Sequence, residues 1–298
     1  MRREEVAFGV PGERRAAWLY RPDGPEPFPC VVMAHGLAYP KEFGLDAFAS
    51  RFARAGLAAL VFDYRHFGES DGSPRHVLDL EKQREDWDAA FSYVRALPGI
   101  NPERVAAWGT SFSGGHAIET AARNGRVAAA VAQVPLADGR AAARTSSPGR
   151  SLRLFAAALR DLARRRLLGK SPHYVKAVGP PGSLAMVASE EVAEGHAKIA
   201  PPGTSWRNEL GAAAVLQIGR WNPGKLAGRI SCPLLICVSE RDEIVPIGPA
   251  IAAAERAPKG ELRSYPGGHY AAYTGEVFEQ LVRDQIGFFT RHLLSASP

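Results

Sequence analysis

Cysteine is scarce in this sequence: only three of 298 residues are cysteine, at positions 30, 232 and 237. An odd number excludes a framework in which every cysteine is paired, and so few cysteines are typical of a reducing compartment. Long apolar runs are missing too, because none approaches the roughly 18 residues needed to cross a bilayer. No apolar signal-peptide core follows the arginines after Met1. We therefore expect a cytoplasmic protein that does not bind membranes.

The sequence also lacks the spacings that hold metals or nucleotides. It contains no H-E-x-x-H motif, no closely spaced cysteine pair of the zinc-binding kind and no Asp-rich loop. Its glycines do not form a dinucleotide or phosphate-loop fingerprint. We expect neither a metal ion nor a cofactor.

Positive charge is concentrated in one segment. The formal net charge is +6, but Arg140 to Lys170 hold nine cations and one anion, Asp161. That segment carries +8, which leaves −2 for the remainder of the chain. Because the basicity is local, we expect no nucleic-acid partner; the segment instead favours anionic substrates, such as thioesters of coenzyme A or of a carrier protein.

Short apolar runs alternate with amphipathic helical patterns along most of the chain, which predicts a parallel sheet covered on both faces. Two strands near residues 6–10 and 16–20, joined by a turn at Pro11-Gly12, predict an antiparallel start. The other expected strands are 30–34, 57–62, 105–108, 127–134, 234–238 and 262–265. The fold class is therefore α/β.

The stretch from Ala137 to Arg229 departs from this alternation. It is 93 residues long, is interrupted by prolines and shows one helical pattern, at Leu152, Phe155, Leu159 and Leu162. We interpret 137–229 as a lid inserted into a core of residues 1–136 and 230–298. The apolar side of its helix is expected to lie on the fold, with the arginines facing solvent.

The segment Gly109-Thr-Ser-Phe-Ser113 carries the clearest chemical signal. It lies between a buried strand and a helix, which is the nucleophile-elbow pattern with Ser113 in place of the second glycine. Only small residues fit two positions before and after the nucleophile, and Gly109 and Ser113 qualify. We therefore predict Ser111 as the nucleophile.

Two later loops supply the expected partners of Ser111. Asp242 follows a predicted strand, and His269 lies in a Gly-rich loop before the last helix. This order of Ser, Asp and His predicts a triad in which His269 takes the proton and Asp242 orients the imidazole. Asp138, which follows the strand 127–134, is the alternative acid.

The chain resembles the α/β-hydrolases, through His35-Gly36, the run Asp63-Tyr-Arg-His-Phe-Gly68, the Ser111 elbow and the Asp242 and His269 loops. The resemblance covers nearly the whole chain. A subgroup of the family with similar sequences at the elbow and at Asp63–Gly68 includes acyltransferases of polyketide assembly. In this architecture the backbone N–H groups of Leu37 and Phe112 form the oxyanion hole.

The expected function is hydrolysis of a carboxylic ester or thioester of a small-molecule acyl substrate through an acyl-enzyme on Ser111. An acyltransferase, a carbon–carbon bond hydrolase or a peptidase would keep the same residues, and a non-catalytic binding module is a further alternative. Candidate substrate-binding residues are His35, Tyr174, Trp206 and Trp221. The sequence does not specify the oligomeric state.

Overall fold

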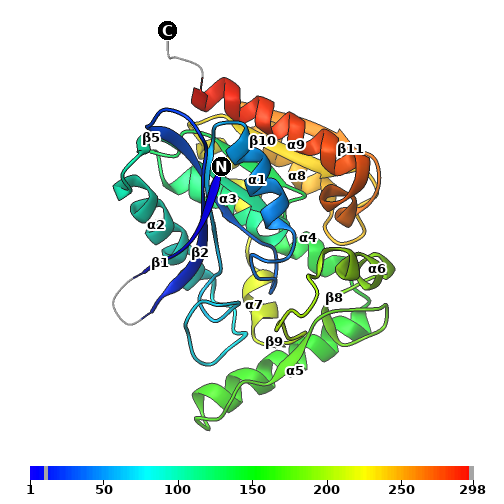
Figure 1. The fold of residues 1–298 in the computed structure, drawn as a ribbon. Coiled ribbons are helices and arrows are strands. Elements are labelled where there is room, and N and C mark those ends of the chain that lie inside the picture. Colours follow the sequence, from blue (N-terminus) through cyan, green and yellow to red (C-terminus); the bar gives the residue numbers. More distant parts are fainter. Residues whose placement is uncertain (10–12, 295–298) are drawn as a thin grey trace.

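The computed structural model describes residues 1–9 and 13–294, which form a sheet of eight strands covered by helices on both faces (Figure 1). The turn expected at Pro11-Gly12 and the expected strand end at Val10 lie outside the described residues. The strands of the large sheet are β1 Arg2–Phe8, β2 Arg15–Arg21, β3 Phe28–Ala34, β4 Ala58–Phe62, β5 Ile100–Thr110, β6 Ala130–Gln133, β10 Leu234–Ser239 and β11 Gly260–Tyr265. The α-helices are α1 Leu45–Arg54, α2 Leu80–Ala96, α3 Phe112–Arg123, α4 Gly139–Arg144, α5 Pro148–Arg166, α6 Glu190–Ile199, α7 Ala214–Ile218, α8 Ile247–Arg256 and α9 Gly275–Phe289.

The strand order is β1-β2-β4-β3-β5-β6-β10-β11. The first two strands pair antiparallel, β2 pairs antiparallel with β4, and all the remaining pairs are parallel. This is the α/β-hydrolase architecture expected from the sequence, with its antiparallel start. Parallel central strands are buried on both faces, which explains their uninterrupted apolar runs.

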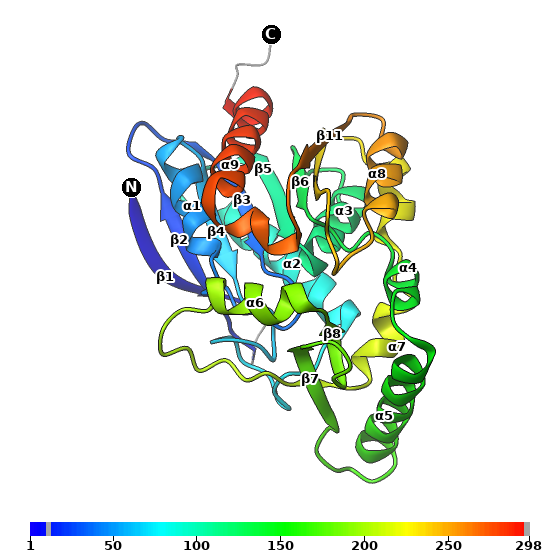
Figure 2. The same cartoon turned by 90° about the vertical axis from the view of Figure 1, so that its right-hand side faces the viewer.

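Two helical layers enclose the sheet (Figure 2). One core cluster joins the sheet to α2, α3 and α8, and the other joins it to α1 and α9. Trp87 of α2 and Phe288 of α9 are among the largest fully buried side chains of the two clusters. Because this core holds the sheet rigid, the loops at the carboxyl ends of the parallel strands become defined platforms for side chains.

Most of the segment between β6 and β10 lies below the sheet in Figure 1. It contains more regular secondary structure than the single helix expected from the sequence. Besides α4 to α7 it contains a second, small sheet and a 3₁₀-helix, η1. Their bounds are β7 Tyr174–Gly179, β8 Ala185–Ala188, β9 Leu210–Gly211 and η1 Pro223–Arg229. The end of the segment returns to the core, because η1 packs against α3 and α8.

Helix α5 corrects one expectation. Leu152, Phe155 and Leu159 do not lie on the fold, because 69%, 48% and 49% of their surfaces are exposed. The buried residues are instead Arg150, Leu154, Ala157, Ala158 and Asp161. The Asp161 carboxylate accepts the backbone N–H groups of His173 (2.9 Å) and Ala213 (2.9 Å). These tertiary hydrogen bonds favour burial of the Asp161 face, and the apolar pattern of the helix does not predict them.

None of the helices in the described part of the chain is long and apolar enough to span a membrane. The three cysteines are free and buried.

Candidate active site

Ser111 occupies the sharp turn between β5 and α3 and has φ 56° and ψ −120°, a backbone conformation that residues other than glycine rarely adopt. The turn is held by the Ser111 N–H, which donates to the Gln133 carbonyl (2.8 Å), and by the Leu136 N–H, which donates to the Ser111 carbonyl (2.9 Å). A β-carbon at Gly109 would lie 1.9 Å from the Ser113 carbonyl oxygen. Only glycine fits there, which is the physical reason for the motif.

Asp242 and His269 come from two separate loops and meet. Asp242 follows β10, and His269 begins the 3₁₀-helix η2 (His269–Tyr273) after β11. Nδ1 of His269 lies 2.7 Å from Oδ2 of Asp242, and both side chains are almost fully buried. The other oxygen, Oδ1, accepts the backbone N–H groups of Ile244 (2.8 Å) and Val245 (2.9 Å), which fixes the carboxylate.

The Asp242 carboxylate sets the protonation of His269. Burial by itself lowers the pKa of His269, but the charge of Asp242 and its hydrogen bond outweigh burial, so that the pKa lies above its usual value. With Nδ1 donating to Asp242, Nε2 is the nitrogen left to accept a proton.

Ser111 and His269 line the same small cavity of about 30 Å³. The Ser111 hydroxyl has no hydrogen-bond partner among residues 1–9 and 13–294, so the Asp242–His269 pair is the only direct link between the three predicted residues in this part of the chain. Catalytic hydrogen bonds are often long before a substrate binds, so this geometry is compatible with proton transfer.

The loop that follows β3 passes directly beside Ser111. A β-carbon at Gly36 would lie 2.9 Å from the Ser111 β-carbon. Leu37 and Phe112 both line a cavity of about 540 Å³ that Ser111 also lines. Neither of their backbone N–H groups is committed to another acceptor among the described residues, and that of Phe112 opens the first turn of α3. Two free donors therefore flank the serine.

His35 shapes this loop from inside. Its Nδ1 accepts the Gly36 N–H (2.6 Å), so Nε2 carries the hydrogen and donates to the Phe43 carbonyl (2.7 Å). Burial lowers the pKa of His35 to about 3, which keeps the ring neutral. His35 also lines the small cavity, but both of its nitrogens are engaged in holding the backbone.

Ser113 has a role that the sequence did not reveal. Its hydroxyl donates to the carbonyl of His35. Since its only hydrogen is used there, Tyr64 Oη donates to Ser113 (2.7 Å), and the indole of Trp87 donates to Tyr64 Oη (2.7 Å). All four residues are buried. This chain links the nucleophile elbow to the loop that carries Leu37, and the only sequence signal for it is the departure from glycine at position 113.

The second cavity that Ser111 lines has a volume of about 540 Å³. Leu136, Leu154, Met186 and Ile244 contribute to its largely apolar wall, and its rim reaches α5. Its volume is in the range of pockets that enclose drug-sized molecules. It lies between the sheet and the segment of residues 137–229.

Three of the expected substrate-binding residues line neither cavity beside Ser111. Tyr174 donates its hydroxyl to the Arg75 carbonyl (3.0 Å), and Trp206 donates its indole N–H to the Ala38 carbonyl (2.8 Å). Trp221 is buried against Phe112, and its indole donates to Glu119 (2.9 Å). The polar atom of each of these three side chains is hydrogen-bonded to the protein.

The alternative acid, Asp138, has a structural task. It caps α4, where it accepts the N–H groups of Arg140 (2.8 Å) and Ala141 (3.1 Å), and it accepts a bond from the Asn222 amide (2.7 Å). It makes no contact with His269 that would compete with Asp242.

Helix α6 reaches the two acid–base loops through Glu191. One of its carboxylate oxygens accepts the N–H of Tyr270 (2.8 Å), the residue after His269. The other accepts the N–H of Glu243 (3.4 Å), the residue after Asp242. Glu191 also contributes to the raised pKa of His269, after Asp242.

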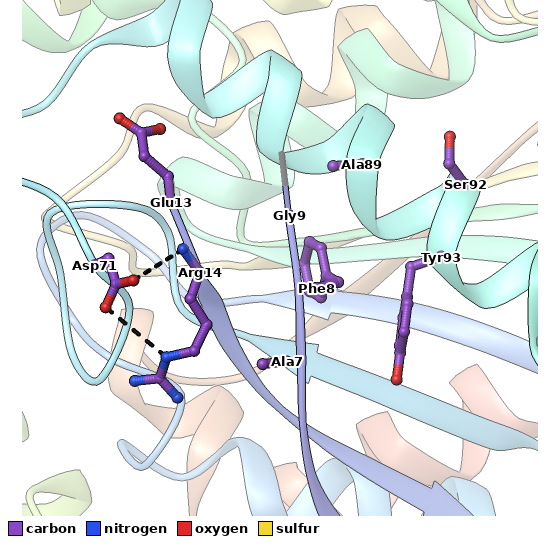
Figure 3. A pocket seen from close by; sticks show the side chains of 9 residues that line it. All are labelled: Ala7, Phe8, Gly9, Glu13, Arg14, Asp71, Ala89, Ser92 and Tyr93. Carbon is purple, nitrogen blue, oxygen red and sulfur yellow. Dashed lines mark hydrogen bonds and ion pairs between the residues drawn. The ribbon is translucent and has the colours of Figure 1, made fainter. Parts of the chain in front are cut away.

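A larger hollow, of about 840 Å³, lies away from Ser111 (Figure 3). It is bordered by Phe8, Tyr93 and the ion-paired Arg14 and Asp71. None of the predicted site residues is among the described residues that line it. Among the described residues, no three His, Cys, Asp or Glu side chains converge as ligands for a metal.

The chain is similar to known proteins over nearly its whole length. The quorum-quenching protein AidA of Acinetobacter baumannii is 41% identical over 287 residues, which are 96% of this chain and 94% of AidA. The thiohydrolase apmlB of Arthrinium phaeospermum is 30% identical over 281 residues, 89% of each chain. The crystal structure of the α/β-hydrolase GrgF from Penicillium superposes with a TM-score of 0.83 at 28% identity, covering 99% of this chain and 100% of that one.

The profile of one hydrolase family, described as serine aminopeptidase, S33, matches residues 25–272. The matched range contains the Ser111 turn, the loop after β3 and the Asp242–His269 pair. On this match and on the identity to AidA, the chain belongs to the serine aminopeptidase S33 family of α/β-hydrolases.

Proposed function

We propose that the protein cleaves a carboxylic ester or thioester through an acyl-enzyme on Ser111, with His269 as general base and acid and Asp242 as its orienting carboxylate. The buried Asp242–His269 pair carries this proposal, because its 2.7 Å contact engages Nδ1 and leaves Nε2 of His269 to act as the base, and because His269 and Ser111 line the same cavity. The residues of segment 137–229 act as the lid over that cavity.

The proposed reaction uses the groups in turn. As Ser111 Oγ attacks the acyl carbon, its proton passes to His269 Nε2 and the carbonyl oxygen becomes an oxyanion between the N–H groups of Leu37 and Phe112. The bond to the leaving group then breaks, and the proton on His269 passes to the leaving oxygen or sulfur. A water molecule, deprotonated by His269, releases the acid and restores Ser111.

Acyl transfer is the second candidate. The relatives include a thiohydrolase and a protein named polyketide transferase grgF, and both chemistries would share the acyl-enzyme. The two differ only in whether water or a bound alcohol or amine attacks it. Adding such nucleophiles to the assay and measuring the ratio of transferred to hydrolysed product distinguishes them.

A fluorophosphonate probe and a panel of p-nitrophenyl esters and thioesters of increasing acyl length test the proposal. The probe should label Ser111 and fail to label Ser111→Ala, whose kcat should fall by about 10⁶. Because the cavity is roomy and apolar, longer acyl chains should raise kcat/KM until the cavity is full. Retained activity in Ser111→Ala would refute the mechanism.

A further inference from the structure

Arg150 is a buried cation in the wall of the 540 Å³ cavity beside Ser111. Only 8% of its surface is exposed. Two of its neighbours are main-chain carbonyls of the small sheet, because Nη2 donates to Ala185 (2.6 Å) and Met186 (2.8 Å). Nη1 donates to Ser146 Oγ. These bonds hold the guanidinium in place but bring no negative charge to it.

No carboxylate in the described part of the chain pairs with Arg150. It takes part in no ion pair, and its Nε has no hydrogen-bond partner. Asp161, the acid on the same helix, is committed to Arg165 and to two backbone N–H groups. Glu243, the one acid among the described residues lining the cavity, is exposed and within ion-pair distance of no cation. Of the five N–H donors of Arg150, three bond to described residues, the one on Nε is enclosed by the protein without a partner, and one on Nη1 is left over.

The location makes this lone charge more costly. Arg150 lies in the first turn of α5, where the positive end of the helix dipole disfavours a cation. Burial, and after it the charge of Arg153, lower the pKa of Arg150, yet an arginine stays protonated in proteins. An unpaired buried charge is strongly unfavourable unless something compensates it. The surrounding segment, at +8, offers no compensation.

We propose that the cavity binds an acyl group whose far end is a carboxylate, and that Arg150 is the counter-ion of that carboxylate. This rests on the proposed function only in placing the other, scissile end of the ligand at Ser111. A guanidinium binds a carboxylate through its charge and through charge-assisted hydrogen bonds, and one Nη1 hydrogen of Arg150 remains to make such a bond. The preferred substrates are then esters or thioesters of dicarboxylic half-acids, with an apolar chain between the two ends.

Arg153 provides a matched control. It lies three residues further along α5 and lines the same cavity, but it is exposed. Replacing Arg150 or Arg153 by Met removes one positive charge from the same helix and the same cavity. Only Arg150 is buried and held in place by hydrogen bonds, so only its replacement should abolish recognition of the carboxylate.

Binding is measured in Ser111→Ala, where no turnover is needed. The ligands are the monomethyl and dimethyl esters of linear dicarboxylic acids of about six to twelve carbons, sized to the cavity. In calorimetry the monomethyl ester of the best-fitting length should bind about 10- to 100-fold more tightly than the dimethyl ester. This ratio should fall to near 1 with Arg150→Met and persist with Arg153→Met.

Three results would overturn the proposal: a ratio near 1 with Arg150 present, a ratio unchanged by Arg150→Met, or an equal loss with Arg153→Met, which would indicate only a general positive field. If Arg150→Met does not fold, Arg150→Gln, which can still donate to one carbonyl, is measured in its place. Failure of ester hydrolysis in the wild-type protein would refute the proposed function but leave this binding result standing.

Discussion

Replacing Asp242 by Asn tests the electrostatics of the site most directly. The change keeps the shape of the side chain but removes the charge beside His269 Nδ1, 2.7 Å away. Without it, burial dominates and the pKa of His269 falls below its usual value, whereas in the wild-type protein the carboxylate holds the pKa above it. The amide also offers an N–H to Nδ1 and so favours the wrong tautomer.

Two effects should follow. kcat should drop by about 10⁴, as for the corresponding replacement in a serine protease, which is about 5 kcal/mol of transition-state stabilisation. His269 acts as a base only when neutral, so kcat/KM of the wild-type protein should fall as pH decreases through the raised pKa. In Asp242→Asn this acid limb should move to lower pH.

The assay is kcat/KM for a p-nitrophenyl ester across pH, with folding checked by circular dichroism. Asp138→Asn is the matched control, because Asp138 caps α4 and Asn is an equally good cap. It should leave both the rate and the acid limb in place. An unmoved limb in Asp242→Asn, or a larger loss in Asp138→Asn, would refute the assignment.

Two more changes probe the surroundings. The cations Arg160 and Arg166 of α5 are exposed, do not line the cavity and form no ion pair among the described residues, so any attraction that they exert on a substrate is long-range. kcat/KM for an anionic thioester should therefore fall with added salt while that of a neutral ester stays constant, and reversing both cations to Glu should reduce the difference. Equal salt responses of the two substrates would contradict this. Ser113→Gly should cost about 1 to 3 kcal/mol of unfolding free energy, because it leaves the His35 carbonyl and Tyr64 hydroxyl without their partner. Since the loop of Leu37 loses its anchor, kcat should fall more than KM changes, and an unaltered kcat would show that the anchor is dispensable for the oxyanion hole.

The large sheet and the Ser111 turn could be predicted because their signals are local. Apolar runs of five or six residues mark strands buried on both faces. The close contact between Gly109 and Ser113 requires glycine at position 109, so the elbow motif depends only on residues that are near in sequence. The loop positions of Asp242 and His269 followed from the order of the strands. That order predicts that Asp242 and His269 pair. It does not predict the distance between them or that both side chains are buried.

Other features depend on contacts between distant parts of the chain. The inward face of α5 is chosen by Asp161, whose partners lie 12 and 52 residues away. Arg150 is one of nine cations in its segment, and nothing in the sequence distinguishes the buried one from the rest. The small sheet of β7, β8 and β9 falls in a proline-rich stretch with weak periodicity, so its strands were not expected.

Through Glu191, helix α6 acts as a brace that connects the loops of Asp242 and His269, and its residue Val192 also lines the small cavity. It holds the residue after His269 and the residue after Asp242 at the same time. If α6 swung away to admit each substrate, both loops would lose that acceptor, and the acid–base pair would have to re-form in every cycle. A route past α5, whose first turns line the larger cavity, leaves the brace closed. Substrate exchange would then depend on α5 and proton transfer on the loops held by α6. Residues of α5 could therefore change in evolution without altering the geometry of Asp242 and His269.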